Sequence, residues 1–405
     1  MPYYKGLFDT YPRDVDSPAK RRAAAGLLSL RRRLRKEIPP RTVEETLLLA
    51  TWNIREFGRN KMFGPRLDES IQYIAEIINH FDLVAVQEVK DNLADLKKLI
   101  KVLGDWWEYI VTDVVAGSAG NTERIAYLYD TRKVRFDHVA GEVTLPEEKG
   151  KYWQLARTPF ICTFRTGWRR FALVSVHIYY GESKPLDERR LKEIEKLSAF
   201  LADKNTRRQK DDNGEPESII LLGDFNIFDT KDKTFQALEN NDFTVPIVGK
   251  TNLGDDKYFD QIAFHDPRNL LWPKKRDVPI KNVPRTGVFR FLESVFRDKD
   301  LESYDADMLE TCGEKYTKNE NKEKFYRNWR TFQMSDHCPL WVELRIDFSD
   351  PFIAVAGGLA RRAAATAKAE TKTVKPAKKK PSTAKAGKKT NKKATKKTSK
   401  KSSKK

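Results

Sequence analysis

Residues 219–228 read I-I-L-L-G-D-F-N-I-F, an unbroken apolar run followed by a glycine and two polar residues. Such a run predicts a short strand that is covered on both faces. Period-two alternation would send the side chains of Asp224 and Asn226 to the same side at the end of that strand. A carboxylate beside a carboxamide can hold a hard cation and a phosphate oxygen together. The alternative without a function is an Asx-type turn that closes a core strand.

Other apolar segments of the sequence also carry polar residues at or near one end. They are 47–58 with Asn53, 82–90 with Glu88, 169–180 with His177, 257–264 with Asp260, and 334–346, which Asp336 and His337 head. Segments rich in β-forming residues span 121–130 and 158–164, and apolar residues at 3–4 spacing predict helices over 67–81, 93–103 and 186–201. Many short strands with interspersed helices favour an α/β sandwich over an all-parallel doubly wound sheet.

The polar residues at these strand ends are suited to a hydrolytic site. Carboxylate and amide oxygens without a cysteine or multi-histidine cluster favour Mg²⁺, Mn²⁺ or Ca²⁺ over zinc. Hydrolysis of a phosphodiester needs a deprotonated water, a stabilised oxyanion and a protonated leaving group, which a metal, carboxylates and imidazoles can supply. Each histidine alone is more simply explained as a core or surface imidazole. The inference therefore depends on the joint occurrence of both histidines with acidic residues.

The positive charge of the sequence is concentrated at its two ends. Of the net charge of +19, residues 361–405 carry +18 and residues 1–41 carry +7, which leaves −6 for residues 42–360. We therefore expect a mildly acidic catalytic body, 42–350, between a basic N-terminal arm and a basic C-terminal tail, 351–405. The tail is mostly Lys, Ala, Thr, Ser and Pro, a composition that predicts disorder.

The N-terminal arm contains a segment, 20–38, that predicts a helix with Leu27, Leu30 and Leu34 on one stripe and arginines around it. A helix packed on the body, a membrane-surface helix and an arm that faces nucleic acid all fit this pattern. The chain has three cysteines, an odd and small number that argues for a reducing compartment and against a disulfide framework. We expect a protein of the cytoplasm, nucleoid or nucleus, without a signal peptide or a membrane span.

Eight short motifs follow one another along 47–346: W-N-I-R-E-F-G, V-Q-E-V, T-E-R with Y-L-Y, R-T-P, S-V-H, G-D-F-N, F-D-Q-I and S-D-H-C-P-L. In these motifs the sequence resembles the endonuclease/exonuclease/phosphatase superfamily and, within it, pancreatic-type deoxyribonuclease. The resemblance is interrupted over 265–330, which we expect to build a substrate loop of its own. It implies a four-layer α/β (α+β) sandwich, in which helices flank two packed, mostly antiparallel sheets and the site lies at one end.

The resemblance also implies a role for each matched residue. Glu88 is the implied principal metal ligand, with Asn53 and Asp336 next to the same cation. Asp224 and Asn226 are implied to hold the nucleophilic water, the scissile phosphate or a second cation. The implied cation is Mg²⁺ or Mn²⁺, with Ca²⁺ as a structural ion.

Two carboxylate–imidazole pairs are implied across the phosphate, Glu123 with His177 and Asp260 with His337. A carboxylate raises the basicity of its imidazole and fixes the tautomer. Which histidine is the acid and which is the base stays open at this point. Three basic residues fall where family members contact the substrate backbone, although solvated surface residues would look the same: Arg55, Lys90 and Arg157.

The sequence departs from the pancreatic-type pattern in three respects. We expect neither their signal sequence nor their disulfides, and Asn121 stands where they carry a tyrosine that meets the minor groove. We therefore expect groove binding to be weaker or differently made. The tail segment K-P-A-K-K-K-P-S-T-A-K-A-G-K-K-T-N-K-K resembles the C-terminal tail of linker histones, which implies non-specific binding to polyanions. A low-complexity extension without a selected partner and a segment that binds acidic lipid are the alternatives.

Three hypotheses follow for the function. The leading one is a Mg²⁺- or Mn²⁺-dependent DNA endonuclease, whose partner is nucleic acid, expected to be double-stranded DNA, and which needs no obligate protein partner. The second is a phosphoesterase that acts on inositol phosphates, phospholipids or another small phosphate. The third is a non-catalytic, architectural DNA-binding protein.

Overall fold

The computed structural model describes residues 2–4, 17–58, 60, 62–115, 122–147, 150, 152–211, 217–267 and 285–357. Asn121 and the chain after residue 357 lie outside the described residues, so the consequence drawn from Asn121 and the disorder of the tail stay predictions. The chain divides into two compact units, of which the first ends at Phe348 and the second begins at Ser349. This division falls two residues before the predicted end of the body at 350.

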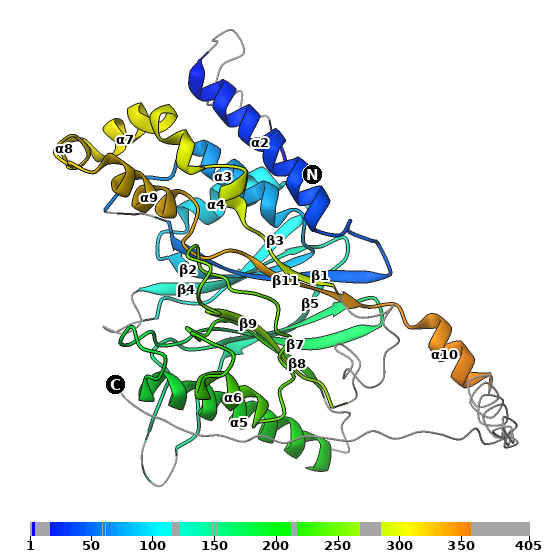
Figure 1. Ribbon diagram of the computed structural model, residues 1–405. Helices are drawn as coiled ribbons and strands as arrows, with labels where there is room; N and C mark the ends of the chain where they lie inside the picture. Colours follow the sequence, from blue (N-terminus) through cyan, green and yellow to red (C-terminus); the bar gives the residue numbers. More distant parts are fainter. Residues whose placement is uncertain are drawn as a thin grey trace, which may run out of the picture. The chain divides into compact units, whose positions relative to one another are not determined.

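Two β-sheets form the centre of the first unit (Figure 1). The first sheet contains β1 (Thr46–Phe57), β2 (Leu83–Lys90), β3 (Trp107–Val111), β4 (Glu123–Asp130), β10 (Thr286–Val288) and β11 (Leu340–Arg345). The second contains β5 (Arg135–Glu142), β6 (Phe160–Thr166), β7 (Arg169–His177), β8 (Ser218–Asp224) and β9 (Asp260–His265). Their strand orders are β10-β11-β1-β2-β4-β3 and β5-β6-β7-β8-β9. The first sheet has one parallel pair, β1 with β2, and the second has one parallel pair, β7 with β8. All other neighbouring strands in the two sheets are antiparallel.

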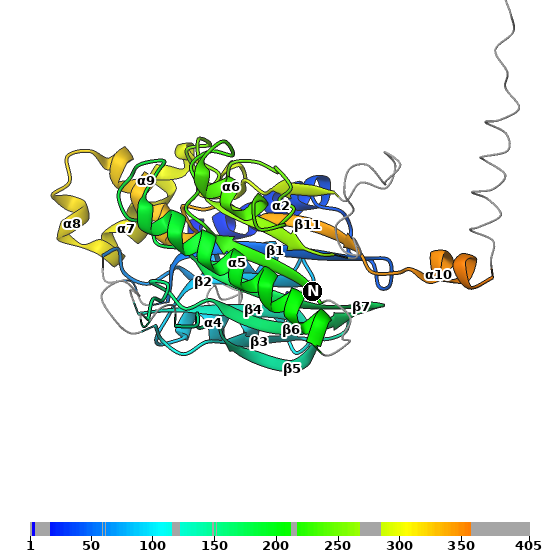
Figure 2. The same cartoon turned by 90° about the horizontal axis from the view of Figure 1, so that it is seen from below.

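Helices cover the outer faces of both sheets and complete four layers (Figure 1). On the first sheet lie α2 (Pro18–Glu37), α3 (Asp68–Ile78), α4 (Ala94–Leu103), α7 (Asp305–Cys312), α8 (Glu314–Thr317) and α9 (Lys322–Gln333), with the 3₁₀ helices η2 (Phe291–Glu293) and η3 (Asp298–Tyr304). On the second lie α5 (Glu188–Asp211) and α6 (Lys233–Glu239), and Figure 2 shows α5 running across the strands. The predicted four-layer sandwich is confirmed.

Continuous apolar strands follow from this layering, because a central strand is buried on both faces. In β8, Ile220 and Leu222 pack between the two sheets, whereas Ile219 and Leu221 pack against the helices on the outer side. The strand β1 alternates in the same way between the inter-sheet core and the core under α2, α3 and α4. The apolar run at 219–222 is therefore a strand for the reason that the sequence suggested.

The N-terminal helix α2 packs on the body, which decides among the three interpretations of segment 20–38. Its buried residues are Ala23, Leu27, Leu30 and Leu34, and the three leucines join the core under the first sheet. Ser17 caps the helix by accepting a hydrogen bond from the backbone N–H of Lys20 at 3.1 Å, and Pro18 stands at the first turn, where a missing N–H has no cost. Among the described residues, no helix combines the length and apolar character that crossing a bilayer requires.

Several elements were not foreseen from the sequence. The strand β5 is mostly exposed at the sheet edge and lacks apolar alternation, so periodicity gave no signal for it. The helix α9 places Phe325, Trp329 and Phe332 on one buried face, a helical spacing that the many charged residues around it obscured. Within 265–330, residues 285–330 form β10 and helices of the outer layer, while 268–284 lie outside the described residues. In the second unit, α10 (Ser349–Ala356) occupies the start of the predicted tail.

Candidate active site

The second sheet brings three candidate residues together through its strand register. His177 ends β7 and is the partner of Asp224 in the parallel pairing of β7 with β8. Asp224 in turn is the partner of Asp260 in the antiparallel pairing of β8 with β9. These three residues therefore lie side by side at one edge of the sheet, where two strands end and the third begins.

The first sheet contributes its residues through two irregularities in pairing. Asn53 is the partner of Gln87 in the parallel pair β1 and β2, and the register then shifts between Asn53 and Phe57. On the other side of β2, two residues stand opposite one residue of β4, and Glu88 there has a φ of 61°. Such a bulge redirects a side chain at the end of a strand, and a left-handed conformation in a glutamate costs energy that functional sites commonly retain.

The sequence left two alternatives for G-D-F-N, a functional strand end and an Asx turn that closes the strand, and the structure contains both features. The backbone N–H of Asn226 donates to Asp224 Oδ1 at 2.9 Å, which is an Asx turn, and Asn226 has a φ of 53°. The two side chains therefore face one cavity because of this turn and not because of strand alternation, which corrects the predicted reason. Gly223 is required, since a Cβ there would lie 2.1 Å from the carbonyl oxygen of Val176.

Two carboxylate–imidazole pairs face each other across Asp224. His177 Nδ1 lies 2.8 Å from Glu123 Oε2, and His337 Nδ1 lies 2.8 Å from Asp260 Oδ2. The Nε2 atoms of the two imidazoles lie 3.6 and 3.8 Å from the same oxygen, Asp224 Oδ2. Because each Nδ1 bonds a carboxylate, each Nε2 is the atom that faces the space between the pairs.

The charges in this cluster favour protonated imidazoles. Burial lowers the pKa of His337, but Asp260 and Asp224 outweigh it and hold that pKa well above its usual value. Burial likewise opposes a charge on His177, yet the Glu123 carboxylate raises the pKa of this imidazole overall. For Glu123, burial acts to raise the pKa, and His177 and Arg157 overcome it and lower the pKa to about 2. Both imidazoles can therefore hold a proton near neutral pH.

The predicted metal ligands have the donor chemistry of a hard cation. Glu88 Oε1 accepts from Asn53 Nδ2 at 3.0 Å, and Asn53 Oδ1 is buried without a hydrogen-bond donor among the described residues. Burial, and then the carboxylate of Glu123, raises the pKa of Glu88, a cost that a cation would offset. Asp336, whose side chain is 39% exposed, borders the same cavity and lies 3.4 Å from Arg55 Nη1. Oxygen donors of this kind suit Mg²⁺ or Mn²⁺.

Distances between possible ligand atoms indicate two further groups of residues that could bind a metal ion. The ligand atoms of Glu88, Glu123 and His177 lie within 4.8 Å of one another, and so do those of Asp224, Asp260 and His337. Each group takes one of the two carboxylate–imidazole pairs, so a cation bound there would compete with the proton that the imidazole transfers. These groups therefore do not replace the set of Glu88, Asn53 and Asp336, which remains a prediction.

Three cationic side chains border the cavity. Arg157 Nε lies 2.9 Å from Glu123 Oε2, and its Nη1 is buried without an acceptor among the described residues. Arg55 Nη1 donates to Thr331 Oγ1 at 2.7 Å, and the guanidinium lies 4.0 Å from the ring centre of Phe332. Helix α9 begins within segment 265–330 and contacts Arg55 through residues of its last turn, just after that segment. Lys90, the last residue of β2, is partly exposed.

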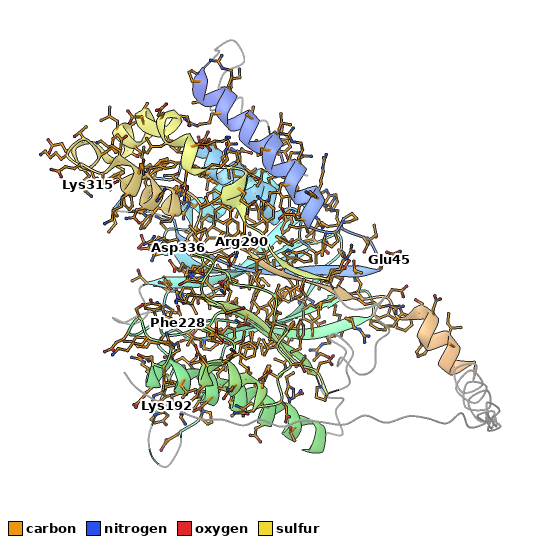
Figure 3. The ribbon with its side chains drawn as sticks, in the orientation of Figure 1. Glu45, Lys192, Phe228, Arg290, Lys315 and Asp336 are labelled. Atoms are coloured by element: carbon orange, nitrogen blue, oxygen red, sulfur yellow. The ribbon has the colours of Figure 1, made fainter. Side chains whose placement is uncertain are left out.

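These residues surround one cavity of about 820 Å³. Of the predicted site residues, ten line it: Arg55, Glu88, Lys90, Glu123, Arg157, His177, Asp224, Asn226, Asp336 and His337. The remaining two, Asn53 and Asp260, lie behind this lining and contact Asp224 and His337 respectively. Figure 3 labels Asp336 and Phe228 at the same end of the two sheets, which is the end where the cavity opens.

Sequence reasoning missed residues that support the site from behind. The hydroxyl of Ser335 donates to the carbonyl oxygen of Asn53 at 2.6 Å and accepts from the backbone N–H of His337 at 3.0 Å. It joins the segments of the candidate site that contain Asn53 and His337, and its place in S-D-H was the available signal. Gln87 Nε2 donates to Ser175 Oγ at 2.9 Å and so joins β2 to β7 across the two sheets. A glutamine in a buried strand was the signal for that residue.

The profile of the Endonuclease/Exonuclease/phosphatase family matches residues 50–276, more than half of the chain. This chain belongs to that family. Dog deoxyribonuclease-1 is 29% identical over 190 residues, 44% of this chain and 60% of the relative. Bovine deoxyribonuclease-1 is 29% identical over 189 residues, 45% of this chain and 61% of the relative. The chain thus spans about 60% of the length of these curated relatives.

Among solved structures, a family protein from Bacteroides thetaiotaomicron is similar at 17% identity and a TM-score of 0.45, covering 76% of this chain and 97% of that one. Members of this family are hydrolases that act on phosphoester bonds. The acidic and imidazole groups of the cavity could bind a divalent metal.

Proposed function

We propose that this protein is a DNA endonuclease that hydrolyses phosphodiester bonds with Mg²⁺ or Mn²⁺. The observation that carries the proposal is the convergence of two carboxylate-bound imidazoles on one oxygen of Asp224, at 3.6 and 3.8 Å. A phosphodiester presents an attacked phosphorus between an entering and a leaving oxygen. Two imidazoles on opposite sides of Asp224 Oδ2 could serve these two oxygens, one by accepting a proton and the other by donating one.

The two imidazoles divide the proton transfers between them. The imidazole that is neutral in the complex with substrate accepts the proton of the attacking water at its Nε2, and the imidazole that stays protonated donates its Nε2 proton to the leaving oxygen. Glu123 and Asp260 hold the Nδ1 atoms at 2.8 Å, so each ring keeps its orientation and its tautomer during the transfer. Asp224 and Asn226 orient the water and the phosphate, and Asn226 is itself fixed by donating to the carbonyl oxygen of Ile178 at 2.8 Å.

The cationic residues stabilise the negative charge that develops on the phosphate. Arg157 presents a buried Nη1 that has no acceptor among the described residues, which suits a non-bridging phosphate oxygen. Arg55 and Lys90 extend the positive charge along the rim, where the neighbouring phosphates of a polymer would lie. Glu88, Asn53 and Asp336 would hold the cation, which lowers the pKa of a bound water and neutralises phosphate charge.

Double-stranded DNA is the proposed substrate. The similarity to deoxyribonuclease-1 supports DNA as the substrate. The tail supports a polyanionic substrate, because its charge of +18 favours binding through counterion release. We propose that the protein acts in the cytoplasm or at chromosomal DNA, without a membrane span.

The test is nicking of a supercoiled plasmid by the purified full-length protein. We expect nicking with Mg²⁺ or Mn²⁺ and none with EDTA. Parallel assays use an inositol phosphate panel, phospholipid vesicles and RNA. Release of phosphate from the small substrates without plasmid nicking would favour the phosphoesterase, and DNA binding without any turnover would favour the architectural protein.

A further inference from the structure

A buried carboxylate outside the cavity contacts two of the loops that form it. Glu193, on α5, has no exposed surface and does not line the cavity. Its Oε1 accepts from the backbone N–H of Ala156 at 2.9 Å, and its Oε2 accepts from the backbone N–H of Tyr179 at 2.9 Å. Arg189, one turn earlier on α5, lies 3.3 Å from Oε1.

Each of these two backbone groups is next to a residue of the site. Ala156 precedes Arg157, and Tyr179 lies two residues after His177, which ends β7. Both site residues contact one atom, Glu123 Oε2, at 2.9 and 2.8 Å. The two oxygens of Glu193 therefore hold, from behind, the two loops whose side chains meet on Glu123.

The rest of α5 supports the same loops. The guanidinium of Arg189 lies 4.4 Å from the ring centre of Tyr179, and Arg190 Nη1 donates to the carbonyl oxygen of Tyr180 at 2.9 Å. Ile194 and Leu197 anchor the helix in the core on the outer face of the second sheet. A rigid helix thus fixes the position of the carboxylate relative to β7.

A charged group at this depth is costly, and an apolar side chain would pack α5 on the sheet without that cost. What an apolar side chain lacks is a pair of acceptors for two separate loops. A glutamine would keep one acceptor and turn an N–H group toward a backbone N–H. The arrangement thus has a geometric function that packing alone does not require.

We propose that Glu193 is a positioning residue, which sets the placement of Arg157 and His177 on Glu123 and acts on the reaction only through them. The inference rests on the proposed phosphodiesterase for its kinetic consequence. The geometric part, the effect of Glu193 on the His177–Glu123 hydrogen bond, can be measured without any turnover.

The kinetic experiment compares Glu193→Gln and Glu193→Met with Glu195→Gln, a matched control on an exposed position of the same helix. We expect kcat to fall roughly 10- to 100-fold in both Glu193 variants and to stay unchanged in the control, with circular dichroism confirming folded protein at the assay temperature. The methionine variant removes both acceptors but retains apolar packing, so it tests the idea if the glutamine variant folds poorly.

Coupling separates positioning from a general loss of stability. In a His177→Ala background we expect Glu193→Gln to lower kcat by a smaller factor than in the wild type, because the ring is gone and only the effect through Arg157 remains. The same fold loss in both backgrounds would overturn the proposal.

The second readout is the ¹H chemical shift of the His177 Nδ1–H proton, which reports the hydrogen bond to Glu123. We expect it to move in Glu193→Gln and not in Glu195→Gln. An unmoved proton would overturn the proposal whether or not the protein cleaves DNA. A moved proton in a protein without turnover would reject only the proposed function.

Discussion

Asp224 shows how one residue can serve both the fold and the site. Its Oδ1 accepts the backbone N–H of Asn226 and closes the turn after β8. Its Oδ2 accepts from Asn53 Nδ2 at 2.9 Å and stands between the two imidazoles. Each oxygen has a separate task, so a substitution at this position would disturb the turn and the electrostatics together.

The histidines give the sharpest test at the scale of single residues. We expect His177→Ala and His337→Ala each to lower kcat by roughly 10²–10⁴-fold, the usual contribution of a general acid or base. The double variant should lose less than the product of the two losses, because the groups act as one unit. Steady-state kinetics of plasmid nicking measures both, with His138→Ala as the control at an exposed position. A single variant with near-normal turnover would remove that histidine from the catalytic set.

Removal of the Glu88 carboxylate tests the metal site. We expect Glu88→Ala to abolish metal-dependent cleavage while the protein keeps its fold, because burial makes this carboxylate a poor contributor to stability and a strong ligand for a hard cation. Titration calorimetry with Mn²⁺ should show weaker binding than in the wild type, and thermal unfolding should show a midpoint no lower. Undiminished cleavage by this variant would contradict the assignment of Glu88 to the metal.

At the scale of elements, buried ion pairs join α2 to α3. Arg22 Nε lies 3.1 Å from Glu69 Oε1, and Arg31 Nη1 lies 3.0 Å from Glu76 Oε1. Both glutamate side chains are almost fully buried beneath the arginines. The arginines around the leucine stripe of α2 therefore pair with the body, at least in these two cases, and do not all face solvent.

Glu69 makes the α2–α3 contact sensitive to pH. Burial outweighs the attraction of Arg22 and raises the pKa of Glu69 to about 7. A carboxyl group whose pKa is higher in the folded state stabilises the fold below its unfolded pKa, and this stability is lost as the pH rises through about 7. We expect the free energy of unfolding to fall by up to roughly 3 kcal/mol over that interval.

Urea unfolding between pH 4.5 and pH 8 measures this effect. Glu69→Gln should remove most of the decline, whereas Glu37→Gln should keep it, since Glu37 is a partly exposed partner of Arg33. Equal pH profiles for the wild type and Glu69→Gln would show that the loss arises elsewhere.

At the scale of the whole molecule, charge is separated from chemistry. The site lies in the first unit, which ends at Phe348, and the sequence places +18 of the net +19 in residues 361–405. Without these residues the chain carries +1. Long-range attraction to DNA and turnover at the phosphate should therefore be separable.

Deletion of 361–405 tests this separation. If a third of the nineteen tail charges meet phosphates, the slope of log affinity against log salt should flatten by roughly 5. Turnover on a short oligonucleotide at saturation should hardly change, because the deletion removes no group of the cavity. A salt series of DNA affinities for full-length and truncated protein gives the slopes. Equal slopes would mean that the tail serves another partner.

The sequence by itself determined the central apolar strands, the residues at their ends and the family. An unbroken apolar run such as 219–222 is typical of a strand covered on both faces, and the polar residues that follow several such runs pointed to a site at the strand ends. The sequence also determined where the positive charge lies along the chain, because this depends only on the positions of the charged residues. Local patterns of this kind depend on neighbours within a few positions, which a sequence displays directly.

The family resemblance implied two carboxylate–imidazole pairs, but only the tertiary structure showed the contacts themselves and the residues that support them. The distances that join Glu123 to His177 and Asp260 to His337 depend on strand register between segments 54 and 77 positions apart. Arg55 contacts α9, and Glu193 accepts hydrogen bonds from two loops, and both sets of contacts likewise link distant segments. Sequence periodicity describes one element at a time. The packing of the two sheets brings these side chains to one end of the molecule and gives each its partner.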